Sequence, residues 1–418
     1  MSRKRRIAIT GVGMISACGI GYEALWQSAL EGRSAIRELA DFSLNGSPIR
    51  VGGEIVGFKP ADFVKSRKSL KVMSRDIQLA VAASTLAVQD SGIQLDCIDR
   101  TRVGVTLASG LINNELEELG VGIKQSLDSE GRFQLKRFGR EGIRALYPLW
   151  LLKYLPNMPA CHISILHGLK GPSNTLTTSS TGGIQAIGEA YRVIEREDAD
   201  LMLAGATDSK INPLGLSRFH LLGILSERNH VPAEIYRPFD LRRDGMVVGE
   251  GAGIFVLEEL GHALSRGAKI YGEVLGYSAT FNSQERAMIN ALEEAERDPD
   301  EVGFVYANGS GIPKEDILEA RAIVKVFHDG TRRIPVTASK SITGHLIDAS
   351  GTTELSLALL ASTRRTLPPI VNLEEPDPEC DLNFVMRAPR PLEERSCLVN
   401  ASGFGGQSAA LIVGEHGK

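Results

Sequence analysis

The stretch GPSNTLTTSSTGGIQAIGEA, residues 171–190, decides how this sequence is interpreted. A strand is expected to run into a turn of small hydroxylated residues, and a helix is expected over residues 181–195. Ser180 lies at this turn, where the free N–H groups and the dipole of the helix stabilise negative charge. That position suits a nucleophile. The alternative is a serine that only caps the helix, because serine is a common N-cap residue.

Composition and charge limit the class of protein. The chain has 418 residues, of which 43% are hydrophobic, and its 47 Lys and Arg against 51 Asp and Glu give a net charge of −4. Such a chain is expected to be globular with a large core. Nucleic acid is not expected as a partner, because phosphate binding needs a clustered basic surface. No window approaches the roughly 18–20 uninterrupted apolar residues of a membrane span.

Cysteine and histidine usage bears on the compartment and on metal binding. The five cysteines are scattered and form no CxxC, which is typical of reduced thiols in the cytoplasm. The eight histidines show no HExxH or paired spacing, so no metal is expected. The glycine cluster VVGEGAG (247–253) is not a dinucleotide fingerprint, and no cofactor is expected. We therefore expect a cytoplasmic protein without metal or cofactor.

Short apolar runs alternate with longer amphipathic stretches along the whole chain. This order predicts an α/β fold whose strands are buried on both faces. The N-terminal segment is interpreted as a strand followed by a turn at Gly11-Val-Gly13, in preference to a signal peptide. The expected strands cover residues 6–10, 102–107, 200–204, 251–258, 270–276, 302–307, 398–401 and 409–413. The expected helices cover residues 22–30, 73–90, 181–195, 282–296, 315–327 and 352–362.

Two similar segments suggest an internal duplication. Both VGVTLASG (103–110) and VGFVYANGSG (302–311) are expected strands that lead into a turn of small residues before a helix. Two related halves, residues 1–255 and 256–418, would explain a chain of this length without an obvious linker. Residues 112–160 interrupt the alternation of apolar and amphipathic stretches with mixed charged and aromatic residues. They are interpreted as an inserted cap or contact segment.

Several further stretches identify a family when they are taken in order with residues 171–190. The chain resembles the β-ketoacyl-[acyl carrier protein] synthases, the condensing enzymes of fatty-acid and polyketide synthesis. The resemblance implies a thiolase-like five-layer αβαβα fold of two similar halves, and a dimer. It is carried by RRIAITGVGMISACG (5–19), YRPFDLRRDGMVVGEGAGIFVLEEL (236–260), KSITGHLIDASG (340–351), PPIVNLEEPDP (368–378) and NASGFGGQSAALIV (400–413).

The catalytic positions implied by the resemblance are altered. Ser180 stands where the family has its nucleophilic cysteine, and Asn308 stands where it has its first histidine. A serine hydroxyl needs a general base, and an asparagine cannot exchange a proton. Losing one such group typically costs about 10²–10⁴ in rate, so little condensation is expected. The family's lysine, second histidine and two acidic residues are matched by Lys340, His345, Asp316 and Glu319.

Other departures concern the gate and the tunnel of the resembled enzymes. Ser402 replaces the first gating phenylalanine, whereas Phe404 keeps the second. The segment between residues 281 and 291 is shorter than in a typical active synthase. Leu149 and Trp150 fall where active synthases place residues that cross the dimer interface and cap the partner's acyl tunnel. Leu111 completes the expected tunnel and gate positions.

This set of losses resembles the chain-length-factor subunit, also called ketosynthase β, of type II polyketide synthases. The resemblance implies a non-condensing subunit that forms a heterodimer with an active ketosynthase, shapes its acyl tunnel and meets an acyl carrier protein. Two alternatives stay open. The chain is a Ser180-dependent acyltransferase or a decarboxylase assisted by His345, or it is an ordinary condensing enzyme whose cysteine was replaced. The basic stretch KSRKSLKVMSR (65–75) either attracts an acidic carrier protein electrostatically or is only the solvent-exposed start of a helix.

Overall fold

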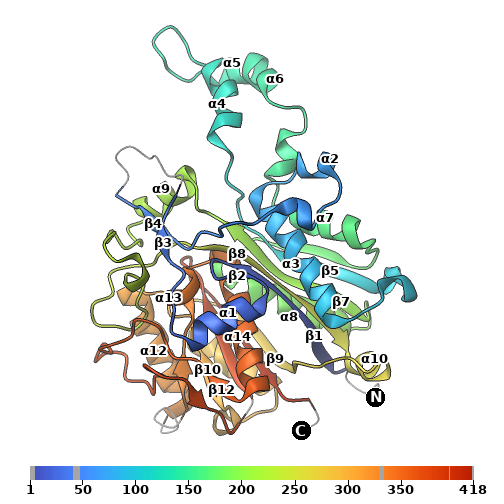
Figure 1. The fold of residues 1–418 in the computed structure, drawn as a ribbon, viewed down its shortest axis with the longest axis vertical. Coiled ribbons are helices and arrows are strands. Elements are labelled where there is room, and N and C mark those ends of the chain that lie inside the picture. Colours follow the sequence, from blue (N-terminus) through green and yellow to red (C-terminus); the bar gives the residue numbers. More distant parts are fainter. Residues whose placement is uncertain (1–4, 41–47, 329–333, 395, 417–418) are drawn as a thin grey trace.

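The computed structural model describes residues 5–40, 48–328, 334–394 and 396–416. They form an α/β fold with a large central sheet and helices on its faces (Figure 1). The strands are β1 (Ile7–Ser16), β2 (Gly19–Ile20), β3 (Arg37–Glu38), β4 (Val51–Gly52), β5 (Val103–Ala108), β6 (Ser173–Leu176), β7 (Leu201–Ser209), β8 (Glu250–Glu259), β9 (Gly272–Phe281), β10 (Phe304–Tyr306), β11 (Val336–Thr337), β12 (Thr366–Leu367), β13 (Arg390–Pro391), β14 (Cys397–Ser402) and β15 (Gln407–Gly414). The α-helices are α1 (Tyr22–Leu30), α2 (Arg67–Leu70), α3 (Arg75–Ser91), α4 (Leu116–Lys124), α5 (Leu135–Arg137), α6 (Ile143–Ala145), α7 (Met158–His167), α8 (Gly182–Glu195), α9 (Pro213–Leu221), α10 (Leu260–Ser265), α11 (Gln284–Glu294), α12 (Pro313–Phe327), α13 (Lys340–Thr343) and α14 (Ser350–Arg364).

The two halves of the chain have the same strand topology. The sheet order is β6-β5-β7-β8-β1 in the first half and β11-β10-β14-β15-β9 in the second. If the five strands of each half are numbered in chain order, their order across the sheet is 3-2-4-5-1 in both halves. In each half the first three neighbours are parallel and the remaining pairs are antiparallel. The similar segments at 103–110 and 302–311 begin in or just before β5 and β10, which hold the same place in their halves, so the two similar halves are confirmed.

The layers follow from which helices contact which strands. Helices α3 and α7 cover the outer face of the first half, where α3 contacts β1, β7 and β8. Helices α8 and α14 lie between the halves, because each contacts strands of both. Helix α11 packs on β9, β14 and β15, with α12 beside it. This is the expected five-layer αβαβα arrangement, and β1 and β9 pair over Ile7–Ile9, so that the strand layers of the two halves form one continuous sheet.

The connection between the halves lies between β8 and β9. A boundary at 255/256 would therefore cut β8. Whether residues 1–255 and 256–418 are separate domains stays a prediction.

The turn expected at Gly11-Val-Gly13 is wrong, because these residues lie inside β1. A Cβ on Gly13 would lie 1.9 Å from the carbonyl oxygen of Ala83 in α3, and one on Gly11 would lie 2.4 Å from that of Ala87. The two glycines therefore let a helix lie directly on the strand. Helix α3 begins at the N-cap Ser74 and ends at the left-handed Gly92, close to the predicted ends.

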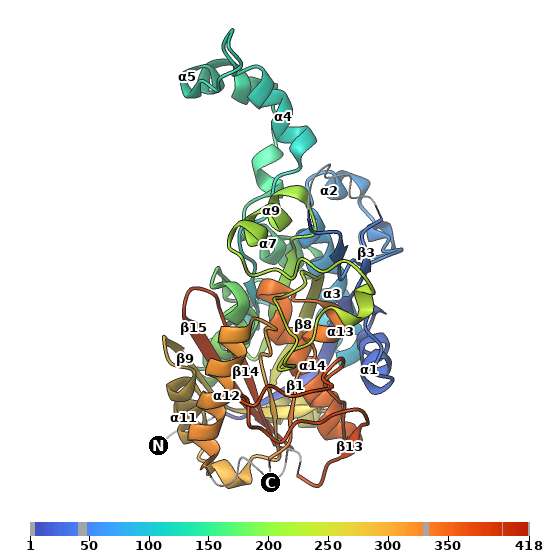
Figure 2. The same ribbon diagram turned by 90° about the vertical axis from the view of Figure 1, so that its left-hand side faces the viewer.

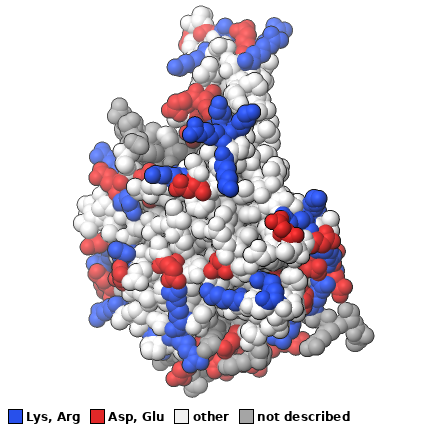
Figure 3. All heavy atoms as spheres, turned by 45° about the vertical axis from the view of Figure 1, so that its right-hand side comes forward, with Lys and Arg blue, Asp and Glu red and all other residues white. Residues whose placement is uncertain are grey.

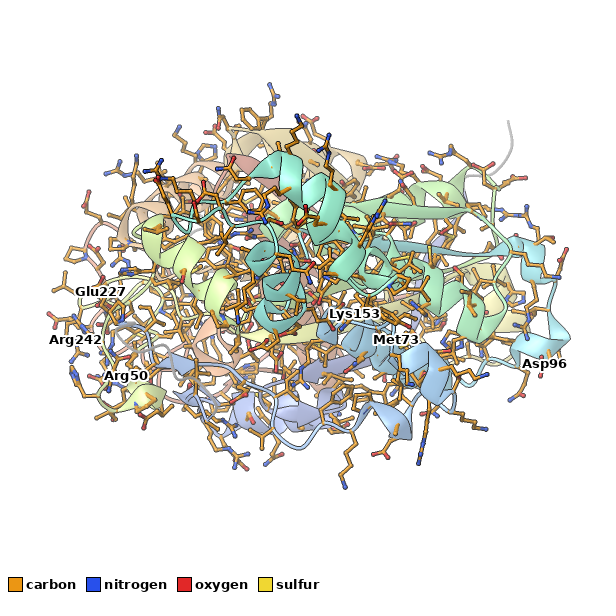
Figure 4. The ribbon with its side chains drawn as sticks, turned by 90° about the horizontal axis from the view of Figure 1, so that it is seen from above. Arg50, Met73, Asp96, Lys153, Glu227 and Arg242 are labelled. Atoms are coloured by element: carbon orange, nitrogen blue, oxygen red, sulfur yellow. The ribbon has the colours of Figure 1, made fainter. Side chains whose placement is uncertain are left out.

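Residues 115–157, here called the arm, extend away from the body and carry α4, α5 and α6 (Figures 1 and 2). The arm lies within the segment expected as an insert at about 112–160. Glu118 anchors its base, where its carboxylate accepts from Lys153 Nζ and, at 2.7 Å, from Tyr154 Oη. Figure 4 looks down on the arm and labels Lys153. The arm exposes the apolar side chains Leu116, Val121, Ile123, Phe133, Leu135, Ile143, Tyr147, Leu149 and Leu151.

Figure 3 shows that one flank of the arm and much of the adjoining face of the body carry few charged side chains, whereas acidic and basic side chains gather at the tip and on the other flank of the arm. Within the part of the chain that the structure describes, no helix has the length and apolar character needed to span a membrane.

Candidate functional site

Ser180 lies in a tight turn at the start of α8. It is the middle residue of a single 3₁₀ turn, Ser179–Thr181, and Ser179 adopts a left-handed backbone with φ of 57°. The side chain is fully buried, and its Oγ has no hydrogen-bond partner among the described residues. Thr181 is the N-cap residue of α8, so the interpretation of Ser180 as a helix cap is wrong. The hydroxyl is held next to a helix N-terminus, and no described residue accepts a hydrogen bond from it.

His345 presents an N–H, and not a lone pair, to its surroundings. Its Nδ1 accepts a hydrogen bond of 3.0 Å from the backbone N–H of Ile347, and the Ser350 hydroxyl lies 3.0 Å from the same nitrogen. Because a backbone N–H can only donate, the proton of the neutral ring is on Nε2. Burial and the nearby Lys340 ammonium hold the pKa of His345 well below its usual value. Nε2 is buried without a partner among the described residues, so His345 is a free donor and not a general base.

Asn308 is oriented by a buried lysine. Lys340 Nζ donates to the backbone carbonyl of Asn308 and, at 3.1 Å, to its side-chain Oδ1. The same ammonium pairs with Glu354 Oε1 at 3.1 Å. Desolvation raises the pKa of the Glu354 carboxyl. Because Oδ1 of Asn308 accepts the hydrogen bond from Lys340, the NH₂ group of the amide is the part of the side chain that can donate to another group.

Two buried acids shape the turn that follows β10. Glu319 accepts from the backbone N–H groups of Asn308 and Gly309 at 2.6 and 2.8 Å. Asp316 accepts from the N–H of Gly311 at 3.0 Å. Burial raises the pKa of Glu319 to about 7 and that of Asp316 to about 6. These matched acids hold the backbone of the Asn308 turn in place.

The two gate positions lie at the same site. The ring of Phe404 is 5.4 Å from that of His345, at an interplanar angle of 40°, and 6.2 Å from that of Phe219. Ser402 is buried at the end of β14, and this strand contacts the Ser180 turn. The structure therefore brings together Ser180, Asn308, Lys340, His345, Ser402 and Phe404.

Of the other expected tunnel residues, Leu149 and Trp150 lie in the arm, whereas Leu111 follows Gly110 just before the arm begins. Leu111 and Leu149 are exposed. The ring of Trp150 is folded against Tyr154 of the same chain, with centroids 5.4 Å apart, and its indole N–H is buried without a partner among the described residues. Their role in a partner's tunnel stays a prediction.

Sequence reasoning missed a buried charged group next to the Ser180 turn, here called the Lys210 cluster. Lys210 Nζ pairs with Asp208, lies 4.0 Å from Asp76 Oδ1, and the backbone N–H of Asp348 donates to Asp208 Oδ2 at 3.3 Å. Burial and the Asp208 charge raise the pKa of Asp348 well above its usual value, and burial raises that of Asp76 to about 6. Two features of the sequence could have indicated this cluster. Asp208 and Lys210 follow a strongly apolar run, and Asp348 is an acid within GHLIDASG (344–351). Nowhere in the described ranges are three or more His, Cys, Asp or Glu side chains arranged to hold a metal ion.

Comparison with known proteins defines the class. Residues 4–263 match the family described as Beta-ketoacyl synthase, N-terminal domain, and residues 266–374 match Beta-ketoacyl synthase, C-terminal domain. The chain belongs to the β-ketoacyl synthase family, with the thiolase-like fold of its structural neighbours.

Three relatives place the chain more closely within this family. It is 34% identical to a 3-oxoacyl-[acyl-carrier-protein] synthase 2 of Coxiella burnetii, over 98% of each chain. It is 36% identical to a putative polyketide beta-ketoacyl synthase 1 of Streptomyces cyaneus, over 99% of each chain. Among solved structures it is similar to the ishigamide ketosynthase/chain length factor, with a TM-score of 0.88 and 29% identity over 99% of this chain and 100% of that one.

Proposed function

We propose that this chain is a non-condensing, chain-length-factor-like subunit. It pairs with an active ketosynthase and shapes the tunnel in which that enzyme's polyketide or polyene chain grows. The observation that carries the proposal is the pair Ser180 and His345. A serine nucleophile needs a base that takes its proton, whereas His345 offers only an N–H. The similarity to a ketosynthase/chain length factor supports the same assignment.

The exposed apolar arm supports a protein partner. Nine of its apolar side chains are exposed, and a group of exposed apolar side chains is typical of protein interfaces. Strand β6 adds an accessible sheet edge, because within the described residues it pairs only with β5 and its first residues are exposed. Both features suit a second ketosynthase-like chain that lies against the arm and the sheet edge.

A basic surface is available for the acyl carrier protein. The exposed side chains Lys65, Arg67, Lys68 and Lys71 lie in and beside α2, and in the described part of the chain none of them has an ion pair. Unpaired positive charge steers an acidic partner and accelerates its association. We propose that the carrier protein docks on this surface.

Co-expression with candidate ketosynthases that carry an intact cysteine and both histidines tests the proposed function. We expect a stable heterodimer in which Trp150→Ala changes the length of the product. A stable homodimer that elongates malonyl-carrier protein without a partner would refute the proposed function.

A decarboxylase is the second candidate, because the Nε2–H of His345 has no partner among the described residues and the side chain of Asn308 accepts from Lys340 through Oδ1, so its NH₂ group is the donor end. The Nε2–H of His345 and the amide of Asn308 would stabilise the enolate oxygen formed when a malonyl thioester loses CO₂. Water then supplies the proton that completes an acetyl thioester. Malonyl-carrier protein should then yield CO₂ and acetyl-carrier protein with the Ser180→Ala variant but not with His345→Ala. Equal rates in these two variants and in a blank would remove this candidate.

A further inference from the structure

The carboxyl group of Asp348 occupies the space beside the Ser180 turn. A Cβ on Gly182 would lie 3.1 Å from Asp348 Oδ1, and a Cβ on Gly110 would lie 2.6 Å from Oδ2. Gly182 is two residues beyond Ser180, and Gly110 follows the end of β5. The two missing side chains therefore leave a space next to residue 180, and Asp348 fills it.

This placement of Asp348 is energetically unfavourable. The residue is 2% exposed, and its Oδ1 has no hydrogen-bond partner among the described residues. Its neighbours in the Lys210 cluster are the carboxylates of Asp208 and Asp76. The cluster therefore contains three acidic side chains and a single ammonium group, that of Lys210. Burying an acid with an unpaired oxygen costs stability, and the fold keeps Asp348 in spite of that cost.

An acyl chain attached to residue 180 needs a space that is empty and apolar. A chain that entered the space between Gly110 and Gly182 would overlap the Asp348 carboxyl, and its methylene groups would lie close to the buried charges of Asp208 and Lys210. Neither contact replaces the hydrogen bonds of the cluster, so entry of the chain would leave buried polar groups unpaired.

We propose that Asp348, held by the Lys210 cluster, excludes acyl chains from this subunit's own pocket and so directs the growing chain to the partner. The inference deepens the proposed function, and it means that restoring the nucleophile alone does not restore acyl binding. Asp348 thereby acts as a specificity residue, separate from the change at position 180.

Alkylation of an introduced cysteine tests this directly in the full-length chain. The cysteine sulfur attacks the CH₂ carbon of iodoacetamide or of N-decyl iodoacetamide, iodide leaves, and the thiol proton passes to buffer. Peptide mass spectrometry separates residue 180 from the five native cysteines. The variants are Ser180→Cys, Ser180→Cys with Asp348→Gly, and Ser180→Cys with Asp348→Asn, which keeps the size of the side chain and removes its acid.

We expect Asp348→Gly to raise the rate of decyl labelling at residue 180 at least tenfold over Ser180→Cys alone. The matched Asp348→Asn variant should stay close to the slow rate, since it still fills the space. Fast decyl labelling of Ser180→Cys alone would overturn the inference. So would a lack of decyl labelling in a folded Asp348→Gly variant, because another group would then close the space. Failure of the proposed function is a separate result, since it appears as loss of partner binding and not as a labelling rate.

Discussion

At the scale of single residues, His345 offers an N–H donor, and no described residue forms a hydrogen bond with the buried Ser180 hydroxyl. Both donors to His345 Nδ1 come from the same short segment, Ile347 and Ser350. The sequence predicted that Ser180, Asn308, Lys340 and His345 would belong to one site, and the structure brings them together. The tautomer of His345 could not be predicted, because it depends on a backbone N–H that only the folded turn places next to the ring.

The hydrogen bonding of the site predicts that Ser→Ala substitutions at positions 180 and 350 lower the free energy of unfolding by different amounts. Ser180→Ala removes a hydroxyl that has no partner, so the free energy of unfolding should change by less than about 1 kcal/mol. Ser350→Ala removes the hydroxyl that lies within hydrogen-bond distance of His345 Nδ1, and it should lower the free energy of unfolding by about 1 kcal/mol or more. Thermal unfolding in one buffer compares the two variants. A larger loss from Ser180→Ala than from Ser350→Ala would contradict the hydrogen-bond assignment.

Asp348 predicts a pH-dependent difference in stability. Its pKa is raised in the folded chain by burial and by Asp208, so above the unfolded pKa the native state holds the proton that the unfolded state has released. Asp348 therefore lowers stability as the pH rises above about 4, and Asp348→Asn removes this loss. The facing groups Asp208, Lys210 and Asp76 are the same in both proteins.

Thermal unfolding of the wild type and of Asp348→Asn at pH 4, 5.5 and 7 measures this difference. The two should be nearly equal at pH 4, and the variant should gain stability toward pH 7 by at most about 1.4 kcal/mol per pH unit. A variant that loses stability toward pH 7 would show that the Asp348 carboxylate is stabilised in the fold.

At the scale of elements, the predicted helices and strands are largely confirmed, since their apolar periodicity is strong. The prediction of a turn at Gly11 and Gly13 is wrong, because glycines that indicate a turn in the sequence here leave room for the backbone of α3. The sequence indicates the arm only by a break in the alternation of apolar and amphipathic stretches, because contacts at its base, such as that of Glu118 with Tyr154, join residues far apart in the sequence.

The arm gives a prediction at this scale. Leu135 is 76% exposed on α5, so Leu135→Glu should leave thermal stability unchanged but place a charge in the proposed interface and weaken partner binding at least tenfold. Leu264→Glu is the matched control, since Leu264 is 52% exposed on α10, away from the arm (Figure 1). Affinities measured by titration with the partner compare the two. Equal affinities would show that the tip of the arm is not part of the interface.

At the scale of the whole molecule, the chain has the fold of the β-ketoacyl synthase family, built from two halves with the same strand order. The repeated strand order explains why two short segments, 103–110 and 302–311, could indicate two halves from sequence alone. The Lys210 cluster could not be predicted, because Asp76, Asp208 and Asp348 come from three distant segments that only the fold brings together.

Product formation from malonyl-carrier protein, measured by mass spectrometry with this chain alone and with its ketosynthase partner, tests the central claim most directly. We predict no elongated product from the chain alone, elongation in the heterodimer, and the same product when the heterodimer contains Ser180→Ala. Elongated product from the chain alone, abolished by Ser180→Ala, would contradict the claim that this subunit does not condense.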